Sequence, residues 1–442
     1  MGQIFEPYEP DQGLLFPPSL DDWLPEGHLA RFISDTVDEL DLRPFLEKFD
    51  KREDGRGQLA FHPRMMLKVL LYAYCEGIFS SRKIARGIEN LVPLRYLAAG
   101  CEPSHRTIAR FRLENLEHFQ RLFVEVVRIA TRAGLVKMGT IAIDGTKMKA
   151  NASRHKAMSY GRMKAEEKRL REEIRRITEL ARGIDEQEDA EFGPDFRGDE
   201  LPEELRRRKD RLEAIRAAKK ALEEEQAAAD AAAGRGKRRE KSGRGPKLKR
   251  PNGVPDDKKQ VNFTDPESRI IGDPKKGFVQ GYNAQIAVDG TERIIVAAGI
   301  TQCAADNGQL VPMTKAARTN TRKKARRVLA DSGYKSEENF ERLERMGIDA
   351  HVALGRGESE GILNSGAGPA TRRMHRKRRT KRSRMLYKKR KGIVEPVFGW
   401  IKSAMGFRDF SMRGLAKATG EWNLVCLAMN LKQLASRLKW VT

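Results

Sequence analysis

Apolar residues recur at helical spacing through the first part of the chain. The stretches 28–40 and 64–75 both have this period, and the second follows His62-Pro63, a signal for a helix start. A longer helical stretch covers residues 115–133. The sequence therefore predicts an all-α N-terminal domain over residues 1–135.

The period changes at Thr140, where short apolar runs typical of buried strands begin. These runs are 141–143, 281–289, 293–300, 327–330 and 349–354. The second and third form a hairpin by pattern, helices are expected at 307–317 and 337–345, and an apolar helix lies near the C-terminus. This element order predicts an α/β fold with an RNase H-like mixed sheet, built from residues 136–155 and 260–442.

A heptad pattern separates the first predicted strand from the others. Its apolar positions are Met163, Leu170, Ile174, Ile177, Ala181 and Ile184, followed by Leu205, Leu212, Ile215 and Leu222. An acidic stretch with two prolines, 185–202, lies between the two sets. The pattern predicts an inserted antiparallel helical hairpin over 156–232, and a basic, flexible linker over 233–259.

The charge balance indicates a polyanionic partner. The 442 residues include 86 Lys and Arg against 62 Asp and Glu, giving a formal net charge of +24. Nucleic acid is the commonest partner of so basic a chain. The four cysteines include no C-x-x-C pair, so neither a zinc ribbon nor a disulfide framework is indicated. With no signal-peptide pattern and no apolar run long enough to span a bilayer, we expect a cytoplasmic, nucleoid-associated protein.

Three acidic residues far apart in the sequence have contexts that suit one metal site. Asp144 and Asp331 end apolar strand-like runs, and Glu395 lies on a helix-like stretch. Carboxylates in this arrangement can hold two Mg²⁺ ions, or Mn²⁺, and such a pair of ions catalyses phosphodiester cleavage and joining. Taken singly, each has an ordinary alternative: Asp144 a turn, Asp331 a helix cap and Glu395 a surface position.

The helix around Glu395 has two distinct faces. Its apolar stripe comprises Val394, Val397 or Phe398, Ile401 and Met405. Glu395, Gly399 and Lys402 form a separate stripe at i, i+4 and i+7. Glu395 is therefore predicted to face the metal ions while Lys402 meets a phosphate on the same side.

Basic residues precede this helix. The segment 371–391 holds thirteen Lys and Arg and no acid, which favours a loop that clamps DNA over a solvated insert. Predicted DNA contacts near the site are Lys402, Lys391, Arg390, Tyr387, Arg382, Arg379 and Lys147.

The N-terminal region also carries clustered basic residues. They are Arg82, Lys83, Arg86, Arg106, Arg110 and Arg112, on short helices that resemble a helix-turn-helix layout. Arg106 and Arg110 are the predicted DNA contacts there, and ordinary helical packing with solvated arginines is the alternative. Asp306-Asn307 is expected to cap the helix that follows it.

Several of these motifs together resemble a known family. The sequence resembles bacterial insertion-sequence transposases of the DDE type with an InsH-like N-terminal domain. The similar segments are residues 62–68, 77–82, the block Asp144-Gly145-Thr146-Lys147, and residues 330–334, 394–402 and 423–431. The resemblance implies an RNase H-like catalytic domain, divalent metal, recognition of terminal inverted repeats, and assembly on DNA as a homodimer or larger oligomer.

The resemblance is incomplete just before the glutamate. The family often shows Tyr, two residues, Arg, three residues, Glu, six residues, Lys. Glu395 and Lys402 fit, but Lys391 stands at the Arg position with Arg390 one residue earlier, and Lys388 stands at the Tyr position beside Tyr387.

These features together predict a DNA transposase that cleaves strands at element ends and joins a 3′-OH to target DNA. Its N-terminal domain would bind the end sequence or help the protein to oligomerise. Two alternatives stay open at this level. One is a nuclease of the same fold without strand joining. The other is a non-catalytic DNA-binding protein, such as a decayed or domesticated transposase.

Overall fold

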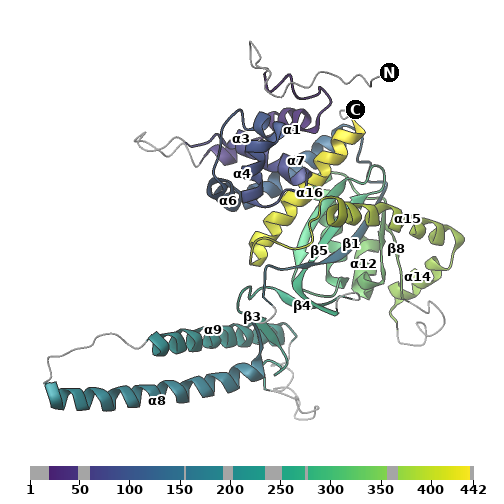
Figure 1. The fold of residues 1–442 in the computed structure, drawn as a ribbon. Coiled ribbons are helices and arrows are strands. Elements are labelled where there is room, and N and C mark those ends of the chain that lie inside the picture. The colour runs from purple at the N-terminus through teal and green to yellow at the C-terminus, as the bar shows by residue number, and fades with distance from the viewer. Residues whose placement is uncertain are drawn as a thin grey trace, which may run out of the picture.

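A six-stranded mixed sheet lies at the centre of the described structure (Figure 1). The computed structural model describes residues 19–47, 60–153, 156–192, 203–233, 251–273, 277–355 and 367–438. The strands are β1 (Thr140–Lys149), β4 (Arg269–Asp273), β5 (Gly277–Asp289), β6 (Ile295–Thr301), β7 (Arg327–Ala330) and β8 (Asp349–Val352). Their order is β4-β5-β1-β7-β8, with β6 also paired to β5. β5 is antiparallel to β1, whereas β7 and β8 continue the sheet in parallel, which agrees with the predicted RNase H-like fold class.

The strand β1 is longer than the sequence predicted. Asp144 was expected to end it, but β1 continues through Lys149 because the 13-residue β5 pairs with it over that whole length. The parallel neighbour β7 stops at Ala330. Asp144 is therefore a mid-strand residue beside the place where β7 ends.

The N-terminal region is helical, as predicted. Its helices are α1 (Leu29–Asp38), α2 (Arg43–Leu46), α3 (Pro63–Cys75), α4 (Ser81–Asn90), α5 (Val92–Leu97), α6 (His105–Glu114) and α7 (Leu116–Arg132). The start of α3 follows from its sequence: Pro63 occupies the first turn, and His62 Nδ1 accepts the N–H of Arg64 at 3.1 Å. Ser104 caps α6 in the same way, by accepting the N–H of Thr107.

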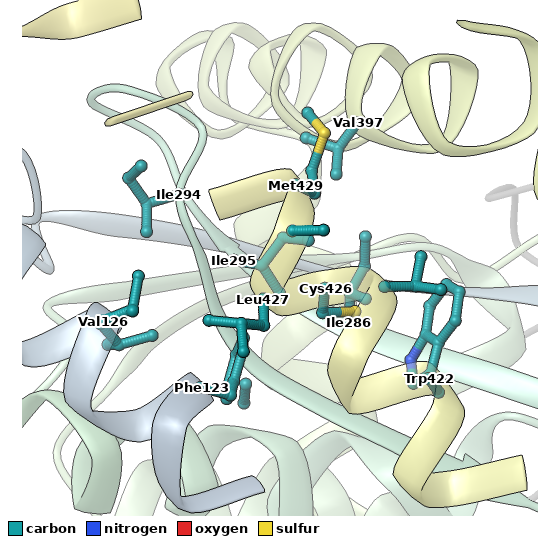
Figure 2. Packing of buried hydrophobic residues seen from close by; sticks show 14 of the residues in the cluster. Phe123, Val126, Ile286, Ile294, Ile295, Val397, Trp422, Cys426, Leu427 and Met429 are labelled. Carbon is teal, nitrogen blue, oxygen red and sulfur yellow. The ribbon is translucent and has the colours of Figure 1, made fainter. Parts of the chain in front are cut away.

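The C-terminal helix α16 (Leu415–Arg437) joins the N-terminal helices to the sheet. It packs on α7, α3 and β6, and Figure 2 shows Phe123 of α7 and Ile295 of β6 on either side of Leu427. Asn430 is fully buried and forms two 2.8 Å hydrogen bonds with the backbone N–H and C=O of Ile295. The helix thus supplies polar partners that an edge strand otherwise lacks.

A long helical hairpin is inserted between β1 and β4. Its arms are α8 (Tyr160–Phe192) and α9 (Glu203–Ala232), and a small sheet of β2 (Ala157–Ser159) and β3 (Gln260–Asn262) lies at its base (Figure 1). The buried residues between the arms include heptad positions Met163, Leu170, Leu212, Ile215 and Leu222. Side chains at heptad positions Ala181 and Ile184, and most of the predicted linker, lie outside the described residues.

The remaining helices follow the strands of the sheet. They are η2 (Asn307–Gln309), α11 (Leu310–Thr321), η3 (Ser332–Tyr334), α12 (Glu337–Arg345), α14 (Pro369–Arg378), α15 (Lys381–Gly399) and the π-helical η4 (Trp400–Ala404). In the part of the chain that the structure covers, no helix is both long and apolar enough to cross a membrane.

The basic segment 371–391 is helical, so its prediction as a loop was wrong. Pro369 starts α14, and Glu337 of α12 accepts the N–H groups of Ala370 and Thr371 at 2.7 and 2.9 Å. A carboxylate at this end also interacts favourably with the helix dipole. Thr380 then caps α15 by accepting the N–H of Ser383.

The close approach of α16 to α7 predicts a stability effect at Gly420. A Cβ there would lie 2.7 Å from Leu116 Cβ, so Gly420→Ala must push the two helices apart. We expect a loss of about 1–3 kcal/mol in the free energy of unfolding, measured by chemical denaturation. Gly392→Ala in α15 is the matched control, since no atom lies within 4 Å of its added Cβ. Equal stability of the two variants would contradict the packing described.

Candidate active site

Two of the predicted acidic residues lie on neighbouring strands. The parallel register pairs Ala142 of β1 with Leu329 of β7, and continuing it by two residues sets Asp144 opposite Asp331. The two carboxylates are close enough for Asp331 to raise the pKa of Asp144. The structure therefore brings together side chains that are 187 positions apart in the sequence.

The Asp144 carboxylate is largely buried and bound to one arginine. Its Oδ2 accepts a hydrogen bond from Arg390 Nη1 of α15 at 2.8 Å, and its Oδ1 accepts the N–H of Gly145. Burial raises its pKa to about 6 and Arg390 opposes the shift, while the negative charge of Asp331 adds to it. Desolvation of the ionised carboxylate is the dominant effect.

Asp331 follows β7 and also caps the short helix after it. Its Oδ1 accepts the N–H of Gly333 at 2.9 Å, so the helix-cap interpretation of this residue describes its local hydrogen bonding. Its second carboxylate oxygen, Oδ2, is not used in this cap. Capping and metal binding are compatible for a residue with two oxygens.

Two cations of the α15–η4 segment reach β1. Arg390 binds Asp144, and Lys402 Nζ donates a hydrogen bond to Thr146 Oγ1. Lys402 lies in the π-helical turn, so its direction differs from that of an α-helical i+7 position, although it still faces the strand. The segment is thereby attached to β1 at two points.

Glu395 lies between these two attachment points in the sequence. Its side chain is exposed on α15, and no hydrogen bond or ion pair joins it to another described residue. Among the described residues, no three His, Cys, Asp or Glu side chains are gathered as a metal site. The buried stripe of Val394, Val397 and Ile401 is confirmed.

A proline shapes the helix beside Glu395. Pro396 has no N–H to offer the carbonyl of Gly392 four residues earlier, and Arg293 Nε donates to that oxygen at 2.9 Å instead. The substitute donor comes from the turn between β5 and β6. The turn of α15 that carries Glu395 is thus fixed by the sheet.

The sequence prediction for Asp306 was wrong. Asp306 stands at the N-cap position of η2, but its side chain makes no capping hydrogen bond. Its Oδ1 accepts hydrogen bonds from Asn283 and Gln285 of β5 at 2.6 and 2.8 Å, and lies 3.4 Å from Lys147 Nζ. The overlooked signal is the polar pair Asn283 and Gln285 at alternate positions in the buried part of β5.

The predicted DNA contacts differ in how exposed their side chains are. Arg379, Arg382 and Lys391 are exposed on α14 and α15 or between them. Lys147 is half-buried and donates to Ala304 O at 2.7 Å. The Tyr387 ring is also half-buried, with the Arg378 guanidinium 4.1 Å from its centroid, so one of its faces already has a cationic partner.

The N-terminal candidates are likewise of two kinds. Arg106 and Arg110 are exposed on α6, and Arg110 forms an ion pair with Glu114. Arg112 is 8% exposed and donates to Tyr74 Oη and Phe79 O, so it holds α3 and α6 together. For Arg112, the alternative of ordinary helical packing therefore describes the structure.

Comparison with protein families decides the class of this protein. Residues 257–431 match the transposase DDE domain, and residues 18–114 match a second transposase domain, DUF772. The chain belongs to the DDE transposases. No curated protein and no solved structure matches it. The DDE match includes Asp331 and Glu395, whereas Asp144 of the transposase precedes it and is linked to the site by the strand register and by Arg390.

The raised pKa of Asp144 predicts a pH-dependent stability of the metal-free transposase. Its pKa is about 6 when folded, against an ordinary value of 3.8, so the folded chain holds this proton more tightly than the unfolded chain. The stabilisation is fully present below the unfolded pKa and is lost as pH rises through about 6, a total of about 3 kcal/mol. Asp144→Asn lacks this dependence. As pH rises, the free energy of unfolding of the variant should therefore increase relative to that of the parent.

Denaturation of both proteins without divalent ions, from about pH 4 to about pH 7.5, measures the difference. Asp210→Asn, at an exposed position of α9, is the control and should keep a constant offset from the parent. A constant offset for Asp144→Asn would show that burial does not perturb this carboxyl.

Proposed function

We propose that this transposase cleaves DNA at the ends of its element and joins the freed 3′-OH to target DNA. The observation that carries the proposal is the placement of Asp144 and Asp331 two residues beyond the last pair of β1 and β7. The α15–η4 segment brings Arg390 and Lys402 to the same part of β1. Acidic groups for metal and basic groups for phosphate then meet at the central strands of the sheet, where β7 ends.

Asp144, Asp331 and Glu395 are the proposed ligands of two Mg²⁺ ions, with Mn²⁺ as a substitute. The donor set fits, since carboxylate oxygens are the ligands that Mg²⁺ prefers and two of the three already interact. Bound divalent ions would activate the attacking water or 3′-hydroxyl and stabilise the leaving oxygen.

The residues themselves supply the rest of the site. Arg390 balances the charge of Asp144, which burial otherwise disfavours. Glu395 is exposed on the same helix, and a change of side-chain rotamer can turn its carboxylate without moving the backbone. Lys402, held by Thr146, places a cation where a phosphate approaches β1.

The exposed cations of α14 and α15 form the proposed DNA surface near the site. They include Arg379, Arg382 and Lys391, with Arg390, Lys402 and Tyr387 at its inner end and Lys147 on β1. Arg106 and Arg110 are proposed to contact the terminal inverted repeat. Assembly as a homodimer or larger oligomer on that DNA belongs to the same proposal.

Removing any one proposed metal ligand should abolish cleavage. Asp144→Ala, Asp331→Ala and Glu395→Ala are each expected to lower the rate by about 10³-fold or more, because the carboxylates act as a unit. The assay follows nicking and strand joining of DNA that carries the segments flanking the gene, with Mg²⁺ present. Glu338→Ala, an exposed helix glutamate of α12, is the matched control for Glu395.

The products of the same assay test the alternatives. Cutting without joined product assigns a nuclease, and binding without any cutting assigns a non-catalytic protein. If all three variants cut like the parent, the proposed site is wrong.

The proposed basic surface predicts a specific change in the salt dependence of DNA binding. The double variant Arg379→Ala/Arg382→Ala is expected to lower the slope of log K against log [salt] by about 2, since each phosphate contact contributes about 0.9. Fluorescence anisotropy with end-bearing DNA at several salt concentrations measures the slope. Lys315→Ala/Arg318→Ala on α11, whose side chains are also exposed, should leave the slope unchanged. Equal slopes for both double variants would exclude α14 and α15 as the DNA surface.

A further inference from the structure

The carboxylate of Asp306 lies where three separate segments of the site meet. It belongs to the loop after β6, which docks on β1, β5 and α12 through side-chain donors aimed at its backbone. Lys147 donates to Ala304 O, Asn283 to Cys303 O, and Asn339 to Asn307 O, at 2.7, 3.1 and 2.6 Å. The loop is therefore held against the sheet on both sides of Asp306.

Two buried amides hold the Asp306 carboxylate itself. Asn283 and Gln285 are both 0% exposed in β5, and each directs its NH₂ group to Oδ1. Buried amides cost several kcal/mol when they lack partners. Asp306 Oδ1 is the acceptor that the two amides share, beside Cys303 O for Asn283 and Asn283 Oδ1 for Gln285. Gln285 also accepts a hydrogen bond from the hydroxyl of the buried Tyr334. The network thus continues from Asp306 to the segment that follows Asp331.

Asp306 packs on a glycine one residue after Asp144 and on another two residues after Asp331. A Cβ on Gly145 would overlap Gln285 Nε2 and would lie 2.8 Å from Asp306 Oδ1. A Cβ on Gly333 would lie 3.1 Å from Asp306 Oδ2 and equally far from Asp331 Oδ1. Both glycines therefore allow the same carboxylate to come close to the backbone.

The charges of three acidic side chains act on one buried phenol, that of Tyr334. Burial raises the pKa of Tyr334, and the charges of Asp306, Asp144 and Asp331 raise it further. Asp306 therefore acts on the same buried phenol as the two aspartates, and its Oδ2 and Asp331 Oδ1 both lie against Gly333. It differs from them in that its Oδ1 already accepts three donors.

We propose that Asp306 is a positioning residue, which fixes the backbone at Gly145 and Gly333 and so holds Asp144 and Asp331 at metal-binding separation. The inference rests on the proposed function, because it takes these two aspartates as metal ligands. Residues that orient metal ligands in this way commonly contribute about 10–100-fold to metal affinity or activity.

Mn²⁺ binding to the full-length, DNA-free protein tests this role without relying on activity. Electron paramagnetic resonance of free Mn²⁺ gives the dissociation constant. Asp306→Ala is expected to weaken binding at least about tenfold. Asp306→Asn keeps an oxygen acceptor for the two amides and should restore binding to within about threefold of the parent. If Asp306→Asn is as impaired as Asp306→Ala, the charge and not the position matters, and the proposal is wrong.

A second pair of variants approaches the same contact from β1. Gly145→Ala displaces Asp306 and Gln285 and should weaken Mn²⁺ binding by a similar factor. Gly139→Ala, where no atom lies within 4 Å of the added Cβ, should not. This pair decides the matter if Asp306→Ala does not fold, since equal binding by both glycine variants overturns the proposal.

Asp331→Ala separates this inference from the function on which it rests. Loss of Mn²⁺ binding in Asp331→Ala with normal binding in Asp306→Ala refutes only the positioning role. Normal binding in both refutes the metal site itself.

Discussion

The ion pair between Arg390 and Asp144 is the interaction on which the geometry of the site depends. It joins α15 to β1 across 246 residues of sequence, in a place where Arg390 is only 8% exposed. A buried guanidinium without an anionic partner is strongly unfavourable, so α15 cannot slide along the strand without losing stability. The bond of Lys402 to Thr146 supplies a second attachment. Both contacts fix the part of the helix that carries Glu395, whose own side chain is exposed.

Gln285 connects this site to the core of the molecule. Its side chain holds Asp306 and accepts the hydroxyl of Tyr334, while its backbone carbonyl accepts the indole N–H of Trp422 in α16 at 3.2 Å. α16 in turn packs on α7 and α3 of the N-terminal region. Figure 2 shows Phe123 and Val126 of α7 on the side of α16 that carries Leu427. The helical region and the acidic site are therefore built around one shared helix, and neither has a core independent of the other.

The sequence alone predicted the structure correctly where a local pattern determines it. The predictions failed where contacts with residues distant in the sequence determine it. Asp331 was placed correctly because a run of three apolar residues, Val328 to Ala330, specifies β7. The buried stripe beside Glu395 follows from helical periodicity. The length of β1 depends on its partner β5, and the start of α14 depends on Glu337. Neither could therefore be predicted from the neighbouring sequence alone. The bonding of Asp306 was hidden because its donors come from another strand.

The inserted hairpin leaves and rejoins the rest of the chain at one narrow stem. β2 and β3 pair there, and Glu167 between the arms is held by Arg171, Arg216 and Lys219, so the insertion has a stabilising centre of its own (Figure 1). Repeats of seven residues added to or removed from both arms preserve the packing between them and leave the stem unchanged. The length of this hairpin can therefore change without altering the sheet that carries Asp144.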